Sequence, residues 1–167
     1  MYGATWLDAR ESSCIMVFLV GGGQNGKSFF VTMLHNAVGN QYIASGKMAL
    51  LTAPTERGES ANSAQMHVEG KRGFYFDESN RCEAINIARF KSMVNMGYQS
   101  GRDLHSKQKN FKVTSNMFAL SNFDLILDTT DHGTWRRVYY HRCDVKFCDN
   151  PDPNNPMEKQ EDPRFAH

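Results

Sequence analysis

Short apolar stretches alternate along the chain with segments whose apolar residues recur at helical spacing. The first stretch, residues 14–20, is continuously apolar, as expected of a strand that is covered on both faces. A glycine cluster comes next, and after it a predicted helix that should end at Gly39. The residues that share the apolar face of this helix are Phe30, Met33, Leu34, Ala37 and Val38.

Further apolar stretches have the length of strands, at residues 48–52, 74–76, 117–120 and 138–140. Helical spacing recurs between them, at residues 61–68 and 87–94. Strands that alternate with helices predict an α/β fold with a central parallel sheet of about five strands. Ligands of such sheets bind at the carboxyl ends of the strands, and polar pairs follow residues 76 and 120 at these ends.

Composition narrows the class of protein. The chain has 167 residues, of which 40% are hydrophobic, and this suits one domain with a buried core. The net charge is +1, so any contact with nucleic acid must come from a local cluster of basic residues. The cysteines are few and scattered, unlike those of a secreted disulfide scaffold. No apolar run reaches transmembrane length, so we expect a soluble, intracellular protein without membrane contact.

The glycine cluster matches the Walker A pattern, in which a glycine-rich loop ends in Gly-Lys-Ser or Gly-Lys-Thr. Such a loop wraps around phosphates with its backbone N–H groups pointing inward, and the following helix adds its positive end. Lys27 would reach the β and γ phosphates, and the Ser28 hydroxyl would hold Mg²⁺. The alternative is a glycine-rich turn with an accidental Lys-Ser. The predicted ATP-binding residues are Gly21, Gly22, Gly23, Gln24, Asn25, Gly26, Lys27 and Ser28.

Residues 74–78 have the form of a Walker B strand that ends in two carboxylates. Asp77 would bind Mg²⁺, and Glu78 would polarise the attacking water as a general base. We expect this acidic pair on the strand next to the first one, facing the metal. Without the loop upstream, the same pair would fit a solvated turn or a helix N-cap.

Two other polar positions fit a site for triphosphate hydrolysis. Asn122 follows the predicted strand 117–120, where an amide can orient the lytic water or sense the γ-phosphate. Arg136 and Arg137 precede the last predicted strand, and an arginine there could reach the γ-phosphate held by a neighbouring subunit. Of the two we favour Arg137 for this role, and a surface pair on a turn is the alternative.

Taken with the loop, these motifs make the chain resemble the superfamily 3 helicases, and in particular the primase-helicases of poxviruses and other large DNA viruses. The resemblance covers about residues 14–147, which is most of the chain. Four segments carry the resemblance. They are the loop at 21–28, the Walker B strand at 74–78 with Gly70-Lys71-Arg72 just before it, the strand end at 119–122, and Trp135-Arg136-Arg137. It implies a P-loop NTPase with an AAA+-like three-layer core, hexameric rings and 3′ to 5′ movement along single-stranded DNA at a fork. The implied catalytic residues are Lys27, Asp77, Glu78, Asn122 and Arg137.

The resemblance also implies a DNA-gripping hairpin between the acidic pair and Asn122. A basic stretch occupies that place, where positive side chains would neutralise DNA phosphates. Charge runs of this kind are often solvated loops. Tyr98 and Phe111 could stack on bases, although such aromatics more often fill the core. The candidate DNA-binding residues are Arg102, His105, Lys107 and Lys109.

The same resemblance suggests that the sequence is one piece of a longer protein, with a primase domain fused or associated. We expect an N-terminal edge segment at 1–13, the ATPase core at 14–147, and an extended Pro-rich tail at 148–167. The expected function is an ATP-driven DNA helicase motor of viral genome replication, acting at the replication site of a host cell. A DNA-binding initiator or genome-handling ATPase without unwinding activity, an inactive remnant and a nucleotide kinase are the alternatives.

Overall fold

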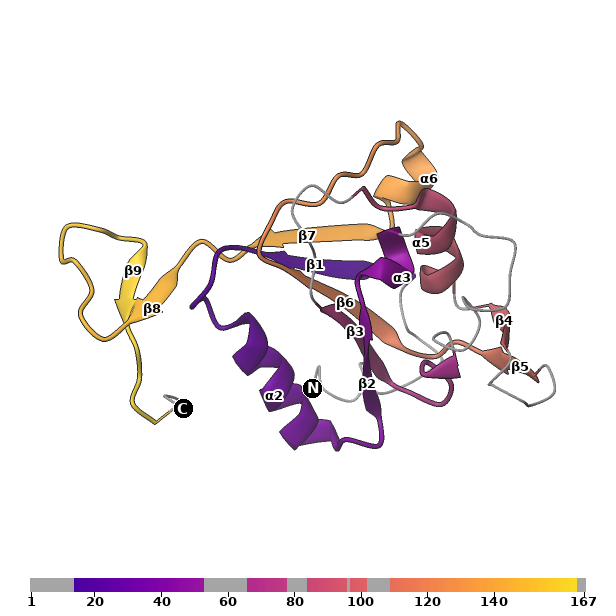
Figure 1. The fold of residues 1–167 in the computed structure, drawn as a ribbon, viewed down its shortest axis with the longest axis horizontal. Helices are drawn as coiled ribbons and strands as arrows, with labels where there is room; N and C mark the ends of the chain where they lie inside the picture. Colours follow the sequence, from indigo (N-terminus) through magenta and orange to yellow (C-terminus); the bar gives the residue numbers. More distant parts are fainter. Residues whose placement is uncertain (1–13, 53–65, 78–83, 96, 102–108, 165–167) are drawn as a thin grey trace.

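A parallel sheet forms the centre of the molecule. The computed structural model describes residues 14–52, 66–77, 84–95, 97–101 and 109–164. Its five-stranded sheet has the order β2-β3-β6-β1-β7, and every pair of neighbouring strands is parallel (Figure 1). The strands are β1 (Met16–Val20), β2 (Ile43–Lys47), β3 (Gly73–Asp77), β6 (Asn116–Ser121) and β7 (Val138–Arg142). The α/β class and the parallel sheet of the sequence prediction are thus confirmed.

Helices cover both faces of this sheet. Successive residues of a strand point to opposite faces, so apolar side chains on both faces need a covering layer. Helix α2 (Lys27–Val38) packs on one face, where the Phe30 ring meets Phe118 at a centroid distance of 5.6 Å. Helix α5 (Ile87–Val94) lies on the other face, where the Phe90 ring is 6.1 Å from that of Phe18 of β1. The short helix α3 (Ala49–Thr52) packs beside α5. The result is a three-layer arrangement.

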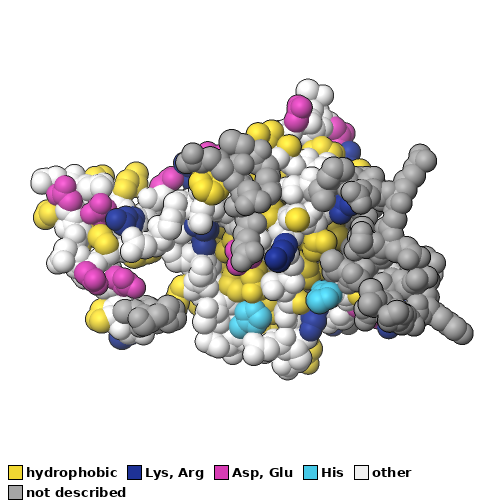
Figure 2. All heavy atoms as spheres, viewed as in Figure 1, with side chains coloured by type: hydrophobic (Ala, Val, Ile, Leu, Met, Phe, Trp, Pro, Cys, Tyr) yellow, Lys and Arg dark blue, Asp and Glu magenta, His cyan; other side chains and the backbone are white. Residues whose placement is uncertain are grey.

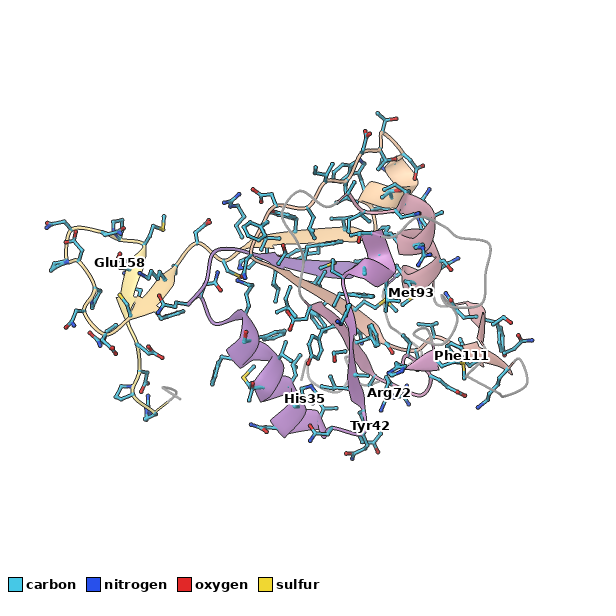
Figure 3. The ribbon with its side chains drawn as sticks, viewed as in Figure 1. His35, Tyr42, Arg72, Met93, Phe111 and Glu158 are labelled. Atoms are coloured by element: carbon cyan, nitrogen blue, oxygen red, sulfur yellow. The ribbon has the colours of Figure 1, made fainter. Side chains whose placement is uncertain are left out.

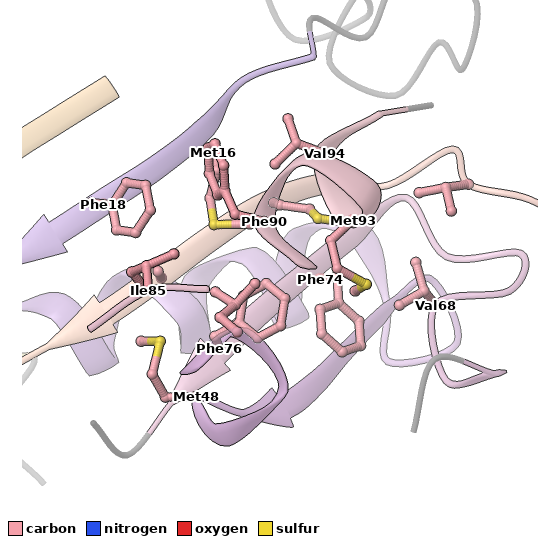
Figure 4. Packing of buried hydrophobic residues seen from close by; sticks show 14 of the residues in the cluster. Met16, Phe18, Met48, Val68, Phe74, Phe76, Ile85, Phe90, Met93 and Val94 are labelled. Atoms are coloured by element: carbon pink, nitrogen blue, oxygen red, sulfur yellow. The ribbon is translucent and has the colours of Figure 1, made fainter. Parts of the chain in front are cut away.

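The core lies mainly between the sheet and α5 (Figure 4). Phe74 and Phe76 of β3 are fully buried, and their rings pack edge to face at 5.1 Å. Phe90 and Met93 of α5 pack against this layer. Burial of each such side chain contributes about 1.5–3 kcal/mol, so this face supplies much of the stability of the fold.

The buried face of α2 differs from the predicted one. Met33 is 47% exposed and Ala37 is also exposed, whereas Lys27 and Val31 are buried. His35 is half-buried and its ring contacts Tyr75 of β3 edge to face (Figure 3). The inward face therefore combines positions 27, 31 and 35 with the predicted Phe30, Leu34 and Val38, which are half-buried. Of the five predicted residues, Met33 and Ala37 are the ones that are exposed.

The predicted strand at 48–52 is wrong. Residues 49–52 form α3, and the strand lies just upstream as β2. Its sequence, Ile-Ala-Ser-Gly-Lys, is weakly apolar because β2 stands at one end of the described sheet. Gly46 is required there, since a Cβ at this position would lie 2.8 Å from side-chain carbons of both Leu50 and Phe74.

Two smaller units project from opposite ends of the sheet. Strands β4 (Tyr98–Gly101) and β5 (Lys109–Lys112) form an antiparallel pair beyond the amino ends of the sheet strands. Strands β8 (Lys146–Cys148) and β9 (Glu158–Gln160) form a parallel pair beyond the carboxyl ends. Figure 1 shows the two units far apart. The helix α6 (His132–Trp135) precedes β7.

The segment expected to be an extended tail thus carries β9, which pairs with β8. The Glu158 carboxylate accepts a hydrogen bond from the Asp152 amide at 2.9 Å and closes the connection between the two strands. The search for membrane-crossing segments found no helix among the described residues that is both long and apolar enough to span a bilayer.

Candidate functional site

The loop at residues 21–26 leaves the carboxyl end of β1 and enters α2. The Gly21 amide donates to the carbonyl of Ser121, at the end of β6, over 3.1 Å. A Cβ on Gly21 would lie 2.5 Å from Nδ2 of Asn25 and closer still to the carbonyl oxygen of Cys143, so glycine is required. Gly26 and Gln24 have positive φ angles of 80° and 60°. These constraints fold the loop tightly over the sheet edge.

Lys27 is held inside this loop. Its side chain is 8% exposed, and its Nζ donates to the Gly21 carbonyl at 2.6 Å and to Oδ1 of Asn25 at 2.7 Å. Asn25 in turn donates from Nδ2 to the Cys143 carbonyl at 3.0 Å. Burial lowers the pKa of the Lys27 ammonium, while Cys143 and Asp77 raise it in partial opposition. The loop therefore positions a positive charge close to Asp77.

Asp77 is exposed at the carboxyl end of β3, and its carbonyl accepts from the Met48 amide at 3.0 Å. The prediction that the acidic pair follows the strand next to β1 is wrong, because β6 lies between β1 and β3. Asp77 still lies at the carboxyl edge of the same sheet as the loop, and its charge raises the pKa of Lys27. Glu78 lies outside the described residues.

Asn122 follows the intervening strand β6 and is exposed at the same edge. The Ser121 hydroxyl donates to the Phe123 carbonyl at 2.5 Å and accepts from the Phe123 amide at 3.0 Å. This small turn places Asn122 in the wall of a cavity beside the loop. The carboxyl edge of the sheet thus brings the loop, Asp77 and Asn122 together.

The cavity has a volume of about 690 Å³. One side is residues 23–29 of the loop and of α2, and Asn122 adjoins them. The other side comes from the β8–β9 unit, through Phe147 and residues 160–162. Neither Phe147 nor residues 160–162 belonged to the predicted site, because no motif marks them and they lie more than a hundred residues from the loop.

The residues of the loop fit a nucleoside triphosphate with Mg²⁺. No side chain caps the start of α2, so the positive end of the helix faces the cavity beside Lys27. Ser28 is exposed in the first turn of α2 and lines the cavity. Its hydroxyl and the Asp77 carboxylate are oxygen donors, the ligand type that Mg²⁺ prefers.

Lys109 is the candidate DNA-binding residue that the structure describes, and it lies away from this cavity. Arg102, His105 and Lys107 are outside the described residues. Lys109 begins β5 at the opposite end of the molecule, where it is exposed and pairs with Glu69 at 2.5 Å. The two aromatic candidates differ, since Tyr98 is 81% exposed on β4 and Phe111 is buried in the core. For Phe111 the core interpretation is confirmed.

Arg136 and Arg137 also lie at the amino edge of the sheet. The Arg137 carbonyl accepts from the Met16 amide at the start of β1, at 2.8 Å. The Arg137 guanidinium is half-buried and donates from Nη1 to the Gly133 carbonyl at 2.5 Å, whereas Arg136 is exposed. The five residues of β1 separate this edge from the loop by roughly 16 Å. Arg137 therefore cannot act on a ligand held by its own loop.

Comparison with known sequences points to large DNA viruses. No protein-family model matches this chain. It is 47% identical over 166 residues to an African swine fever virus protein named "Putative primase", a match that covers 99% of this chain and 17% of that protein. It is 28% identical over 160 residues to the "Putative helicase" of Acanthamoeba polyphaga mimivirus, covering 94% of this chain and 16% of that protein. The chain thus spans about a sixth of the length of these relatives.

Among solved structures, the C-terminal region of NrS-1 has a similar fold. Its A-form apo structure aligns with a TM-score of 0.61 and 16% identity, covering 83% of this chain and 32% of that one. A second apo structure of the same region gives a TM-score of 0.60 at 15% identity, over 83% and 33% of the two chains. At such identity the similarity shows a shared α/β fold, which is consistent with a P-loop-like architecture.

Proposed function

We propose that this chain is the ATP-hydrolysing motor core of a superfamily 3 DNA helicase that acts in viral genome replication. The observation that carries the proposal is the meeting of three separate motifs at one sheet edge. The loop of 21–28, Asp77 and Asn122 stand at the carboxyl ends of three different parallel strands, and Asn122 and Lys27 line the same cavity. A structural turn would not need this convergence.

In this proposal the chain acts as a P-loop NTPase of the AAA+-like class. The loop amides and Lys27 hold the β and γ phosphates of ATP. Ser28 and Asp77 hold Mg²⁺, which supplies neutralisation of the phosphate charge when it is bound. Asn122 orients the attacking water, and Glu78 takes its proton as general base. Burial lowers the pKa of Lys27, and the charges of Cys143 and Asp77 oppose that shift.

A complete catalytic site then requires a second copy of the chain. Arg137 and Arg136 lie on the edge opposite the loop, so they would serve the γ-phosphate that a neighbouring copy holds. A closed hexameric ring gives every copy such a neighbour. Arg137 would have to release the Gly133 carbonyl to do this, whereas Arg136 is already exposed.

Single-stranded DNA, or a forked duplex, is the proposed macromolecular substrate. Lys109 on β5, together with Arg102, His105 and Lys107 before it, would contact DNA phosphates in the channel of the ring. The two named viral relatives support a role in replication, since one carries the name of a primase and the other of a helicase. We propose accordingly that a primase domain is fused to or associated with residues 14–147, which form the motor core, at the viral replication site in the host cell.

The decisive experiment measures the ATPase rate with and without single-stranded DNA over a range of protein concentration. We expect stimulation by DNA and a steep dependence on concentration, because the arginine comes from a neighbour. Glu78→Gln should abolish turnover while ATP binding persists, since it removes the base and leaves the phosphate contacts. Turnover by Glu78→Gln at the wild-type rate would disprove the assignment.

A forked DNA substrate separates a helicase from an initiator that uses the same ATP site. A helicase displaces the paired strand when ATP is present, and Lys27→Ala does not. ATP-dependent DNA binding without strand displacement would instead identify a DNA-gripping initiator.

A further inference from the structure

The cavity beside the loop has a second wall, which the motifs of the loop do not explain. Phe147 and residues 160–162 form this wall, and they belong to the β8–β9 unit. A triphosphate bound along residues 23–28 would leave this side of the 690 Å³ volume unfilled. The chemistry of the second wall therefore indicates what is attached to the phosphates.

Backbone hydrogen bonds fix this wall against the loop. The Phe147 amide donates to the Gln24 carbonyl at 2.7 Å, within the loop itself. Cys148 pairs in register with Gln160, and the Glu161 amide donates to the Cys148 carbonyl at 3.0 Å. The position of Glu161 thus follows from that of Phe147, and both follow from the loop.

Phe147 presents an aromatic surface next to the phosphate-binding turn. Its side chain is 39% exposed although it is large and apolar. A Cβ built on Gly26 would lie 3.8 Å from Cε2 of Phe147, so one edge of the ring adjoins the start of α2. An exposed aromatic ring beside a polar loop is suited to stacking on a nucleobase, which every base permits because each has a π-face.

The two sides of the cavity carry opposite charges. Lys27 and the start of α2 make the loop side positive, whereas Glu161 and Asp162 make the far side negative. Figure 2 shows acidic side chains gathered over the β8–β9 unit. The Asp162 carboxylate is already bound by Arg164 through Nη2 at 2.5 Å and Nε at 3.0 Å. Within the described part of the chain, no hydrogen bond or ion pair engages the half-buried Glu161 carboxylate.

Arg164 offsets the charge of Asp162, so the Glu161 carboxylate is the group that repels phosphates, while Lys27 attracts them to the loop side. The hydroxyl groups of a ribose are donors that a carboxylate accepts, and an acidic side chain often binds them in nucleotide sites. We propose that Phe147 and Glu161 form the nucleoside side of the site, with Phe147 stacking on the base and Glu161 accepting the ribose hydroxyls. The ligand is then a ribonucleoside triphosphate, and this inference rests on the proposed function.

The test compares ATP with inorganic tripolyphosphate, which has the phosphates and no nucleoside. Both are titrated calorimetrically, with Mg²⁺, into the 167-residue chain and its variants. Phe147→Leu keeps an apolar side chain and loses the aromatic face, so ATP affinity should fall about tenfold while tripolyphosphate affinity stays within about twofold. Phe147→Trp should restore ATP binding. Glu161→Gln should reduce the preference for ATP over 2′,3′-dideoxy-ATP by about fivefold.

Met157→Ala is the matched control, because Met157 is 52% exposed on the same unit and does not line the cavity. It should leave the affinities for ATP and tripolyphosphate unchanged. Equal weakening of both ligands by Phe147→Leu would overturn the inference, since the ring would then merely support the loop. Unchanged ATP binding in Phe147→Leu, or an unchanged dideoxy preference in Glu161→Gln, would overturn it as well.

The failure of the proposed function looks different in the same titrations. In that case the wild-type chain binds neither ligand, or Lys27→Ala binds both as the wild type does. Binding of both ligands that depends on Lys27, together with unaffected Phe147 and Glu161 variants, would leave the proposed function standing and reject the nucleoside wall.

Discussion

The two ends of the central sheet differ in what their residues contact. At the carboxyl end, side chains from distant parts of the chain turn toward one another, and Lys27 is bound by its own loop. At the amino end, Tyr98 and Arg136 are exposed, and so is Lys109 beside its partner Glu69. Figure 3 shows this separation, with Phe111 of β5 and Glu158 of β9 at opposite ends of the molecule. A single chain thus lines a cavity at one end of its sheet and exposes basic and aromatic groups at the other.

The largest expected effect concerns the carboxyl end. Lys27→Ala removes the buried ammonium and both of its hydrogen bonds, so ATP turnover should vanish and ATP affinity should fall about 100-fold. Calorimetric titration with ATP and a phosphate-release assay measure this. Lys159→Ala, an exposed lysine of β9, is the control and should behave as the wild type. If Lys27→Ala binds ATP with wild-type affinity, ATP does not bind at the loop, and the carboxyl end is not the ligand site.

Two glycines of the loop test how tightly this end is packed. Gly21→Ala places a Cβ against the Cys143 carbonyl and should lower the free energy of unfolding by about 1–3 kcal/mol. Gly22→Ala meets no atom within 4 Å and should change it by less than about 0.5 kcal/mol. Urea unfolding of both variants gives the two values. Equal stabilities would show that the loop is looser than its contacts indicate.

Asn25 is expected to position Lys27. It bridges the ammonium and the Cys143 carbonyl, so Asn25→Ala should weaken ATP binding about tenfold and leave the fold intact. The comparison is with Asn36→Ala, an exposed residue of α2, whose ATP affinity should equal that of the wild type. If the two variants bind ATP alike, Lys27 is positioned without Asn25.

The double variant Lys107→Ala with Lys109→Ala, of which Lys109 lies at the amino end, should weaken binding of single-stranded DNA about fivefold. The slope of log affinity against log salt should fall by about 1.4 if both lysines contact phosphates. Fluorescence anisotropy at several salt concentrations measures both quantities. Lys146→Ala with Lys159→Ala removes the same charge from the other end and should leave the slope unchanged. Equal salt slopes in the two double variants would show that Lys107 and Lys109 do not contact DNA phosphates.

The smallest effect concerns Asp131 at the start of α6. Lys91, at 2.7 Å, and Thr134 hold the pKa of this carboxyl well below its ordinary value of 3.8. A lowered pKa means that the stabilisation is present above pH 3.8 and disappears as the pH falls through the folded-state pKa. Asp131→Asn should therefore lower the melting temperature slightly at pH 7, by an amount that shrinks on acidification below pH 3.8. If the difference in melting temperature between Asp131→Asn and the wild type does not change with pH, the effect comes from the helix cap and not from the charge of Asp131.

The sequence determined the part of the site that is continuous in the chain. An apolar run, a glycine-rich loop and a helix follow one another within residues 14–38, so local propensities and steric constraints suffice to place Lys27 at a helix start. The same locality predicted that Asp77 and Asn122 each end a strand. The predicted strand at 48–52 failed because its weakly apolar neighbour β2 draws its stability from contacts such as Gly46 with Phe74.

The tertiary structure decided which strand ends lie together. The order of the sheet inserts β6 between β1 and β3, and long-range hydrogen bonding sets this order without a local signal in either strand. It also added Lys27 and Val31 to the buried face of α2 and left Met33 and Ala37 exposed. The contact of Phe147 with the loop joins residues more than a hundred positions apart, through a backbone hydrogen bond that any amino acid except proline could make. For that reason no pattern in the sequence marks the second wall of the cavity.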